Sequence, residues 1–219
     1  FVLVESCIRD CRIREILVQE TRFISNASLN ALLGTLSNTI NLLQRELQTG
    51  RFGPLSRLVL YGGGVHGLAD SWMNPSSRYV PMPRSMPNEK LSTDAIQHTR
   101  ADEEALSYIL CSFCIDLVTE ITIQNKDRLP VVWPLCNDIL DHVFSMGKAT
   151  TPIVSRATVS VFKLILRLLN RAEVEEELLK TLMLILQFPP TVTSDLSPII
   201  VAGLYQTVKL YGSQIKSSL

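Results

Sequence analysis

Three shortages in this 219-residue sequence narrow what the protein can be. Aromatic residues make up 6% of it, there are 3 histidines, and the formal net charge is zero. Without net positive charge the chain as a whole has no attraction to nucleic acid, and we expect no nucleic-acid partner. No run of about 18 uncharged apolar residues occurs, so we predict no membrane span.

The cysteines and the start of the chain indicate where the protein works. Five cysteines, an odd number in a chain of this size, predict reduced thiols and a cytoplasmic protein. The first residue is Phe1, and the apolar start contains Glu5 and Arg9. We therefore expect a piece of a longer protein without a signal peptide.

The clearest pattern lies in residues 101–147, where two apolar rows at helical spacing predict two helices. Ser112, Asp116 and Glu120 lie four residues apart in the first helix and are predicted to face water. In the short connection, Asn125 is predicted to end the first helix and Asp127 to cap the second. So short a connection makes the two helices antiparallel neighbours.

Similar rows predict helices at residues 2–22, 27–47, 152–171, 173–188 and about 193–216. We expect Asn26 or Ser28 to cap the second of these, and Thr193 or Ser194 to cap the last, with Pro198 in its first turn. No strand alternation is present. The predicted fold class is therefore all-α: an α-solenoid of antiparallel helix pairs, HEAT- or armadillo-like, without a strict sequence period.

The composition changes in residues 49–100, which hold five of the 11 prolines and six of the 10 glycines. We predict a long, flexible, largely disordered insert there, with disorder over residues 70–98. The expected organisation is a first helical pair (1–48), this insert (49–100), and helical repeats completing one solenoid domain (101–219).

Metal and catalytic patterns are weak. Cys111 and Cys114 have metal-ligand spacing, but Cys114 lies on or beside the inner face of a predicted helix, which favours buried thiols. The glycines at 62–64 lack the Gly-Lys-Ser/Thr ending of a phosphate loop. The three histidines, His66, His98 and His142, offer no convergent catalytic set. We predict no catalytic residues, no metal and no cofactor.

A basic stripe is the most informative charge pattern. Arg156, Lys163, Arg167 and Arg171 share one face of an otherwise apolar helix, and no acid occurs between Asp141 and Glu173. Such a face can bind an anionic membrane surface, with each cation contributing roughly 1 kcal/mol. The alternative is a core helix of the stack whose single wet face is basic.

Trp133 has two possible roles. It is expected in the first turn of its helix, where it either packs at a helix–helix corner or contacts a partner. Pro134 should bend or delay the start of that helix.

Several segments together resemble a known family. Residues 11–17, which read CRIREIL, and the following Arg22-Phe23-Ile24 resemble the segment just after the catalytic domain of the large Golgi Arf exchange factors. The subfamily meant is that of Gea and the brefeldin-A-resistance factor. Residues 125–133, which read NKDRLPVVW, are similar to its E-N-R-D-R … V-W segment, although Gln124 replaces the Glu and Lys126 the first Arg. Residues 157–171 and 178–190 are also similar to the downstream helices.

The resemblance implies the first homology region downstream of the catalytic domain, which is not itself an enzyme. It implies a regulatory and membrane-recruitment role that supports Arf activation and vesicle trafficking on Golgi membranes, where the protein would be peripheral. The resemblance also implies recruitment to lipid droplets. The expected partners are an anionic lipid such as phosphoinositide, which the basic stripe would bind, neighbouring domains of the same protein, and an Arf- or Rab-type small GTPase. The alternative function is a protein-binding helical scaffold without lipid binding.

Overall fold

The computed structural model describes residues 12–51, 93–146 and 151–215. Within these ranges the chain forms helices and no strand. The helices are α2 (Ile13–Glu20), α3 (Asn26–Thr49), α6 (Thr93–Gln124), the 3-10 turn η1 (Lys126–Arg128), α7 (Leu129–Met146), α8 (Thr151–Leu168), α9 (Glu175–Leu186) and α10 (Pro190–Ile215). The predicted all-α class is confirmed.

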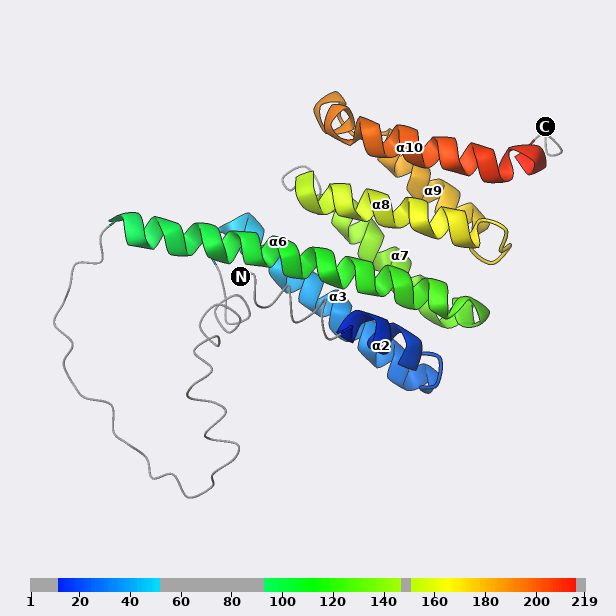
Figure 1. Cartoon of the computed structure of the whole chain (residues 1–219), viewed down its shortest axis with the longest axis horizontal. Helices are drawn as coiled ribbons and strands as arrows, with labels where there is room; N and C mark the ends of the chain where they lie inside the picture. Colours follow the sequence, from blue (N-terminus) through cyan, green and yellow to red (C-terminus); the bar gives the residue numbers. More distant parts are fainter. Residues whose placement is uncertain (1–11, 52–92, 147–150, 216–219) are drawn as a thin grey trace, which may run out of the picture.

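The helices form two layers (Figure 1). Helices α2, α6, α8 and α10 lie in one layer, and α3, α7 and α9 lie behind them. Helix α6 packs between α3 and α8, and α10 packs on α8. Successive helices thus pack on one another along the stack, which is the predicted solenoid.

The repeat exists in structure, although the sequence has no period. Trp133 on α7 contacts Glu177 on α9, and Asn137 contacts Thr181; both pairs lie 44 residues apart. In the other layer Tyr211 donates a hydrogen bond to the backbone oxygen of Leu166, 45 residues before it. A spacing of about 44 residues falls in the HEAT and armadillo range of about 40–47.

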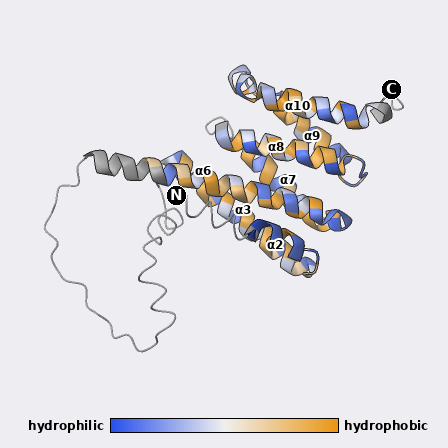
Figure 2. Cartoon of the chain, viewed as in Figure 1, coloured by the Kyte–Doolittle hydropathy of each residue, from blue (hydrophilic) through white to orange (hydrophobic). Residues whose placement is uncertain are grey.

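One continuous apolar core runs between the layers. Its largest fully buried side chains are Leu and Ile from α3, α6, α7 and α8, and each stabilises the fold by about 1.5–3 kcal/mol. Figure 2 shows hydrophobic residues along every helix and hydrophilic turns after α6 and α8, at one end of the stack.

Helix α3 begins one residue before the predicted start, and its cap differs. Ser25, not Asn26 or Ser28, is the N-cap: its hydroxyl accepts the Ser28 backbone N–H at 3.1 Å. The helix ends at Gly50, whose φ of 58° is the left-handed conformation that glycine adopts without strain.

Two further boundaries were predicted wrongly. Helix α6 begins at Thr93, so residues 93–98 are helical where we expected disorder; residues 52–92 lie outside the described part of the chain. Helix α10 begins at Pro190, which leaves Pro198 inside the helix rather than in its first turn. Proline in a first turn is well tolerated, and here the proline that occupies it is Pro190. Of the first predicted helix, residues 1–11 also lie outside the described residues.

Helix α7 starts at Leu129, directly after η1, which contains Asp127. Asp127 therefore lies within a turn and is not the predicted cap. Trp133 and Pro134 lie inside the helix rather than at its start. Asn125 does end α6, as predicted.

By length and composition alone, α6 could cross a membrane over Glu103–Gln124, which the sequence analysis did not anticipate. However, 61% of its most apolar window is buried in the stack. Core helices of water-soluble folds have the same composition, and the packing of α6 between α3 and α8 accounts for it.

Candidate functional site

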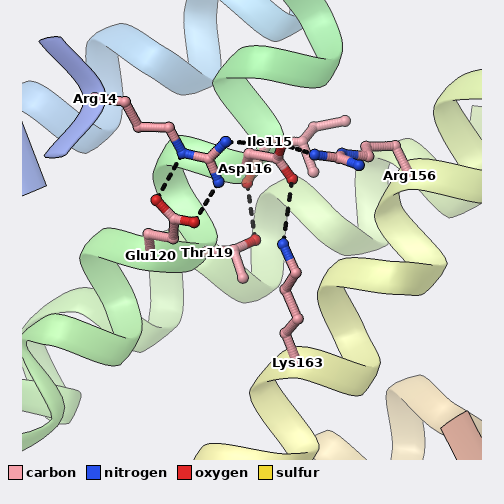
Figure 3. Close-up of polar contacts among 7 residues, drawn as sticks. All are labelled: Arg14, Ile115, Asp116, Thr119, Glu120, Arg156 and Lys163. Carbon is pink, nitrogen blue, oxygen red and sulfur yellow. Dashed lines mark hydrogen bonds and ion pairs between the residues drawn. The ribbon is translucent and has the colours of Figure 1, made fainter. Parts of the chain in front are cut away.

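A buried carboxylate joins three helices at the centre of the front layer (Figure 3). Asp116 on α6 was predicted to face water, but its side chain is 4% exposed. Arg156 and Lys163 reach it from α8, and Arg14 reaches it from α2. The prediction failed because α2 and α8 cover this side of α6, and a carboxylate can be buried there only because cations surround it.

The cluster has one close contact and two longer ones. The Arg156 guanidinium donates to Asp116 Oδ2; Arg14 Nη1 lies 3.4 Å from the same atom, and Lys163 Nζ lies 3.9 Å from Oδ1. Asp116 Oδ1 is buried without a hydrogen bond. The cations themselves are 27 to 40% exposed, so each keeps some contact with water.

Arg14 also holds Glu120, the next acid along α6. Its Nε donates to Glu120 Oε2 at 2.6 Å, and its Nη2 pairs with the other carboxylate oxygen. Partial burial would lower the pKa of Arg14, but this hydrogen bond and the charges of Glu120 and Asp116 raise the pKa overall. Helix α2 is thereby held to α6 by a bidentate, charge-assisted pair.

The predicted basic stripe on α8 is therefore largely engaged inside the molecule. Arg156 and Lys163 pair with Asp116, and Arg171 lies 3.7 Å from Asp127 in η1. Arg167 is exposed, and no ion pair to it occurs within the described residues. The partner acids lie in α6 and η1, 40 to 47 residues earlier in the chain. The sequence of α8 alone therefore does not predict these ion pairs.

A groove of about 810 Å³ opens at the end of the stack where α6 and α8 terminate. Its charged lining consists of four cations and two acids: Arg22, Lys126, Lys163, Arg167, Glu120 and Asp127. The groove is thus net positive. Exposed Arg167 and part-exposed Lys163 make it the place where the α8 stripe reaches solvent.

Asn125 and Arg128, which the family resemblance includes, form a clamp between the α6–α7 turn and the α2–α3 loop. The Asn125 side-chain amide donates at 2.8 Å to Thr21 Oγ1 and to the Ile121 backbone oxygen. Arg128 donates to the backbone oxygens of Thr21 and Ile24 and to Asn125 Oδ1. The sequence analysis assigned Asn125 only a helix-ending role and missed Arg128.

Trp133 is 4% exposed, and its indole N–H donates to the Glu177 carboxylate on α9. Of the two roles left open for it, these contacts favour packing between α7 and α9. The predicted burial of the thiols at Cys111 and Cys114 is confirmed, and Cys136 is buried as well. Burial raises the pKa of Cys111 to about 12 and those of the other two to about 11. Cys7 and Cys11 lie outside the described residues.

Chemically, the cluster consists of ion pairs between the carboxylates of α6 and the cations of α2 and α8. The polar side chains of the cluster are paired with one another, and the buried thiols stay protonated at neutral pH. Within residues 12–51, 93–146 and 151–215, no three His, Cys, Asp or Glu side chains are grouped to hold a metal ion.

Comparison with known proteins finds sequence similarity to Arf exchange factors. The chain is 32% identical over 116 residues to the Golgi-specific brefeldin A-resistance guanine nucleotide exchange factor 1 homolog of Caenorhabditis elegans. It is 31% and 27% identical over 109 residues to the ARF guanine-nucleotide exchange factors GNL1 and GNOM of Arabidopsis thaliana. Over about half of its length, the chain is therefore similar in sequence to Arf guanine-nucleotide exchange factors.

These matches cover about half of the chain, 48 to 52%, and only 6 to 7% of each exchange factor. No protein-family model matches the chain, and no solved structure matches it. The similarity to Arf exchange factors therefore rests on about half of the chain.

Proposed function

We propose that this chain is a non-catalytic regulatory region of an Arf exchange factor. It would support Arf activation and vesicle trafficking through contacts with anionic lipid and with neighbouring regions of the same protein. The observation that carries the proposal is the sequence similarity of about half of the chain to Arf exchange factors. The helical stack, whose polar clusters join helix to helix, supports it. A stack of this kind presents surfaces to partners and positions whatever is attached to it.

Lipid is proposed to bind at the groove where α6 and α8 end, through the cations of the α8 stripe. Arg167 is the leading contact because it is exposed, with Lys163 and Arg171 beside it. Arg156 would contribute least, since its guanidinium is held by Asp116. With so few available cations, binding to a phosphoinositide surface should be weak and sensitive to salt.

The proposed location is the cytoplasmic face of Golgi membranes, as a peripheral protein. The worm relative is Golgi-specific by name, and that supports the location. An Arf- or Rab-type GTPase is the proposed protein partner. Because the chain corresponds to a small part of its relatives, the 219 residues alone should not accelerate nucleotide exchange on Arf.

Vesicle flotation tests the lipid contact. The chain should float with phosphoinositide vesicles at low salt, stay unbound at high salt, and ignore neutral vesicles at both. Equal binding to neutral vesicles would contradict an electrostatic contact. A nucleotide-exchange assay with Arf and the same chain tests the proposal that the chain is non-catalytic. A measurable acceleration of nucleotide exchange would overturn it.

A protein-binding helical scaffold without lipid binding is the second candidate. One observation favours it: three of the four stripe cations are engaged in ion pairs within the stack. Retention of a small GTPase on the immobilised chain, with no response to any vesicle, would support this candidate over the first.

A further inference from the structure

The rear layer contains a surface of a different kind, between α7 and α9. The two helices run in the same direction, as the contacts of Trp133 with Glu177 and Asn137 with Thr181 require. At the end of the pair, the rings of Phe144 and Phe188 meet with centroids 5.7 Å apart. A groove of about 680 Å³ lies between the helices, and a smaller pocket of about 280 Å³ adjoins it.

Apolar side chains line this groove although they are open to water. Leu179, Met183 and Leu184 on α9 are 44, 55 and 42% exposed. The adjoining pocket is walled by the two phenylalanines and by Val192. Its volume suits one large apolar side chain. Exposed apolar surface beside a pocket is typical of a protein-binding site, where an anchor side chain is buried.

The charges around the groove are mostly negative. Asp141, Glu176 and Glu177 line it, and Asp138 lies one turn from Asp141 on α7. Lys180, the one cation in the lining, is 2.7 Å from Glu176. Neither aspartate has a cation partner among the described residues.

Partial burial and the neighbouring acids raise the pKa of Asp141. Partial burial raises the pKa of Asp141, and the charges of Asp138 and Glu177 raise it further, against a hydrogen bond from Asn137. The glutamates are explained by their place in the first turn of α9, where they complement the helix dipole. No such explanation applies to the two aspartates of α7, which lack a cation partner among the described residues, and a bound cation would relieve their repulsion.

We propose that the groove between α7 and α9 binds a basic amphipathic helix of a partner protein. Its apolar face would lie on Leu179, Met183 and Leu184, with one anchor side chain in the pocket beside Phe144, and its Lys or Arg residues would face Asp138 and Asp141. Charge complementarity selects this occupant: an anionic membrane is repelled by the same acids, and a neutral helix leaves them unpaired. This inference goes beyond the proposed function and does not depend on lipid binding.

The test uses a labelled synthetic helix with leucines at i, i+4 and i+7 and lysines beside them, titrated with the 219-residue chain at low salt. Asp138→Lys and Met183→Glu should each weaken binding by about 5-fold or more, from lost charge pairing and lost apolar contact respectively. Their matched controls are Asp195→Lys and Val201→Glu, which make the same changes at exposed positions of α10. Both controls should bind within about 2-fold of the unmodified chain.

Four results would overturn the proposal. One is equal binding of a helix in which glutamates replace the lysines; another is equal weakening by the α10 controls. The third is that a second copy of this chain occupies the groove. Sedimentation would then show a dimer of the unmodified chain, and the Met183→Glu variant would be a monomer. Hydrogen exchange with the peptide bound should slow in α7 and α9, and slowing confined to other helices would equally contradict the assignment.

Discussion

Replacing Asp116 by Asn tests whether the buried carboxylate holds the front layer together. The substitution keeps the shape and removes the charge that Arg14, Arg156 and Lys163 share. Removing one partner of a buried pair costs about 3–5 kcal/mol, because the remaining charge is left uncompensated. Here the cations are 27 to 40% exposed and can turn to water. We therefore expect the free energy of unfolding to fall by about 2–3 kcal/mol.

Urea unfolding measures this change as a lower midpoint at an unchanged slope. Asp195→Asn, at an exposed position of α10, is the matched control and should change stability by less than about 0.5 kcal/mol. A double-mutant cycle with Arg156→Met isolates the closest pair and should give a coupling of about 1 kcal/mol or more. If Asp116→Asn is no more destabilising than the control, or the coupling is zero, the reasoning fails.

Three further predictions concern packing, the clamp and the thiols. Gly203→Ala should lower the free energy of unfolding, measured in urea, by about 1–3 kcal/mol, because the added methyl group meets the buried ring of Phe162. Gly34→Ala, which has open space around it, should stabilise α3 by up to about 1 kcal/mol. Arg128→Ala should cost about 2 kcal/mol in the same assay by leaving loop carbonyls unbonded, and a change under about 0.5 kcal/mol would contradict the clamp. Three buried thiols should resist iodoacetamide at pH 8 in the native chain, because their raised pKa values keep them protonated, and should react once the chain is unfolded. These thiols are Cys111, Cys114 and Cys136. Mass mapping that finds them modified in the native chain would refute this prediction.

The helices and their stacking were predictable because apolar spacing depends on local sequence. The rows in residues 101–147 predict α6 and α7, and short connections predict antiparallel neighbours. Even here, one apolar row does not predict which side chains of a central helix are buried, because other helices pack on more than one of its faces. Ile109 belongs to the apolar row that predicts the inner face of the first helix, yet it is 38% exposed. Asp116 was expected in water and is buried, because α2, α3 and α8 surround α6.

The polar clusters were not predictable from the sequence, because their contacts join residues that are far apart in the chain. The acids that pair with the α8 cations lie 40 to 47 residues away, one repeat earlier in the stack. No period in the sequence aligns those positions. The groove between α7 and α9 likewise depends on two helices that are not consecutive in the chain.

The most direct test of the proposed function is phosphoinositide-vesicle flotation with Arg167→Glu beside Arg45→Glu. Both residues are exposed helical arginines, one on α8 at the cationic groove and one on α3 in the other layer. The account predicts that Arg167→Glu reduces low-salt binding several-fold, while Arg45→Glu binds like the unmodified chain. Equal binding by both variants would show that the α8 stripe serves the stack alone and does not contact lipid.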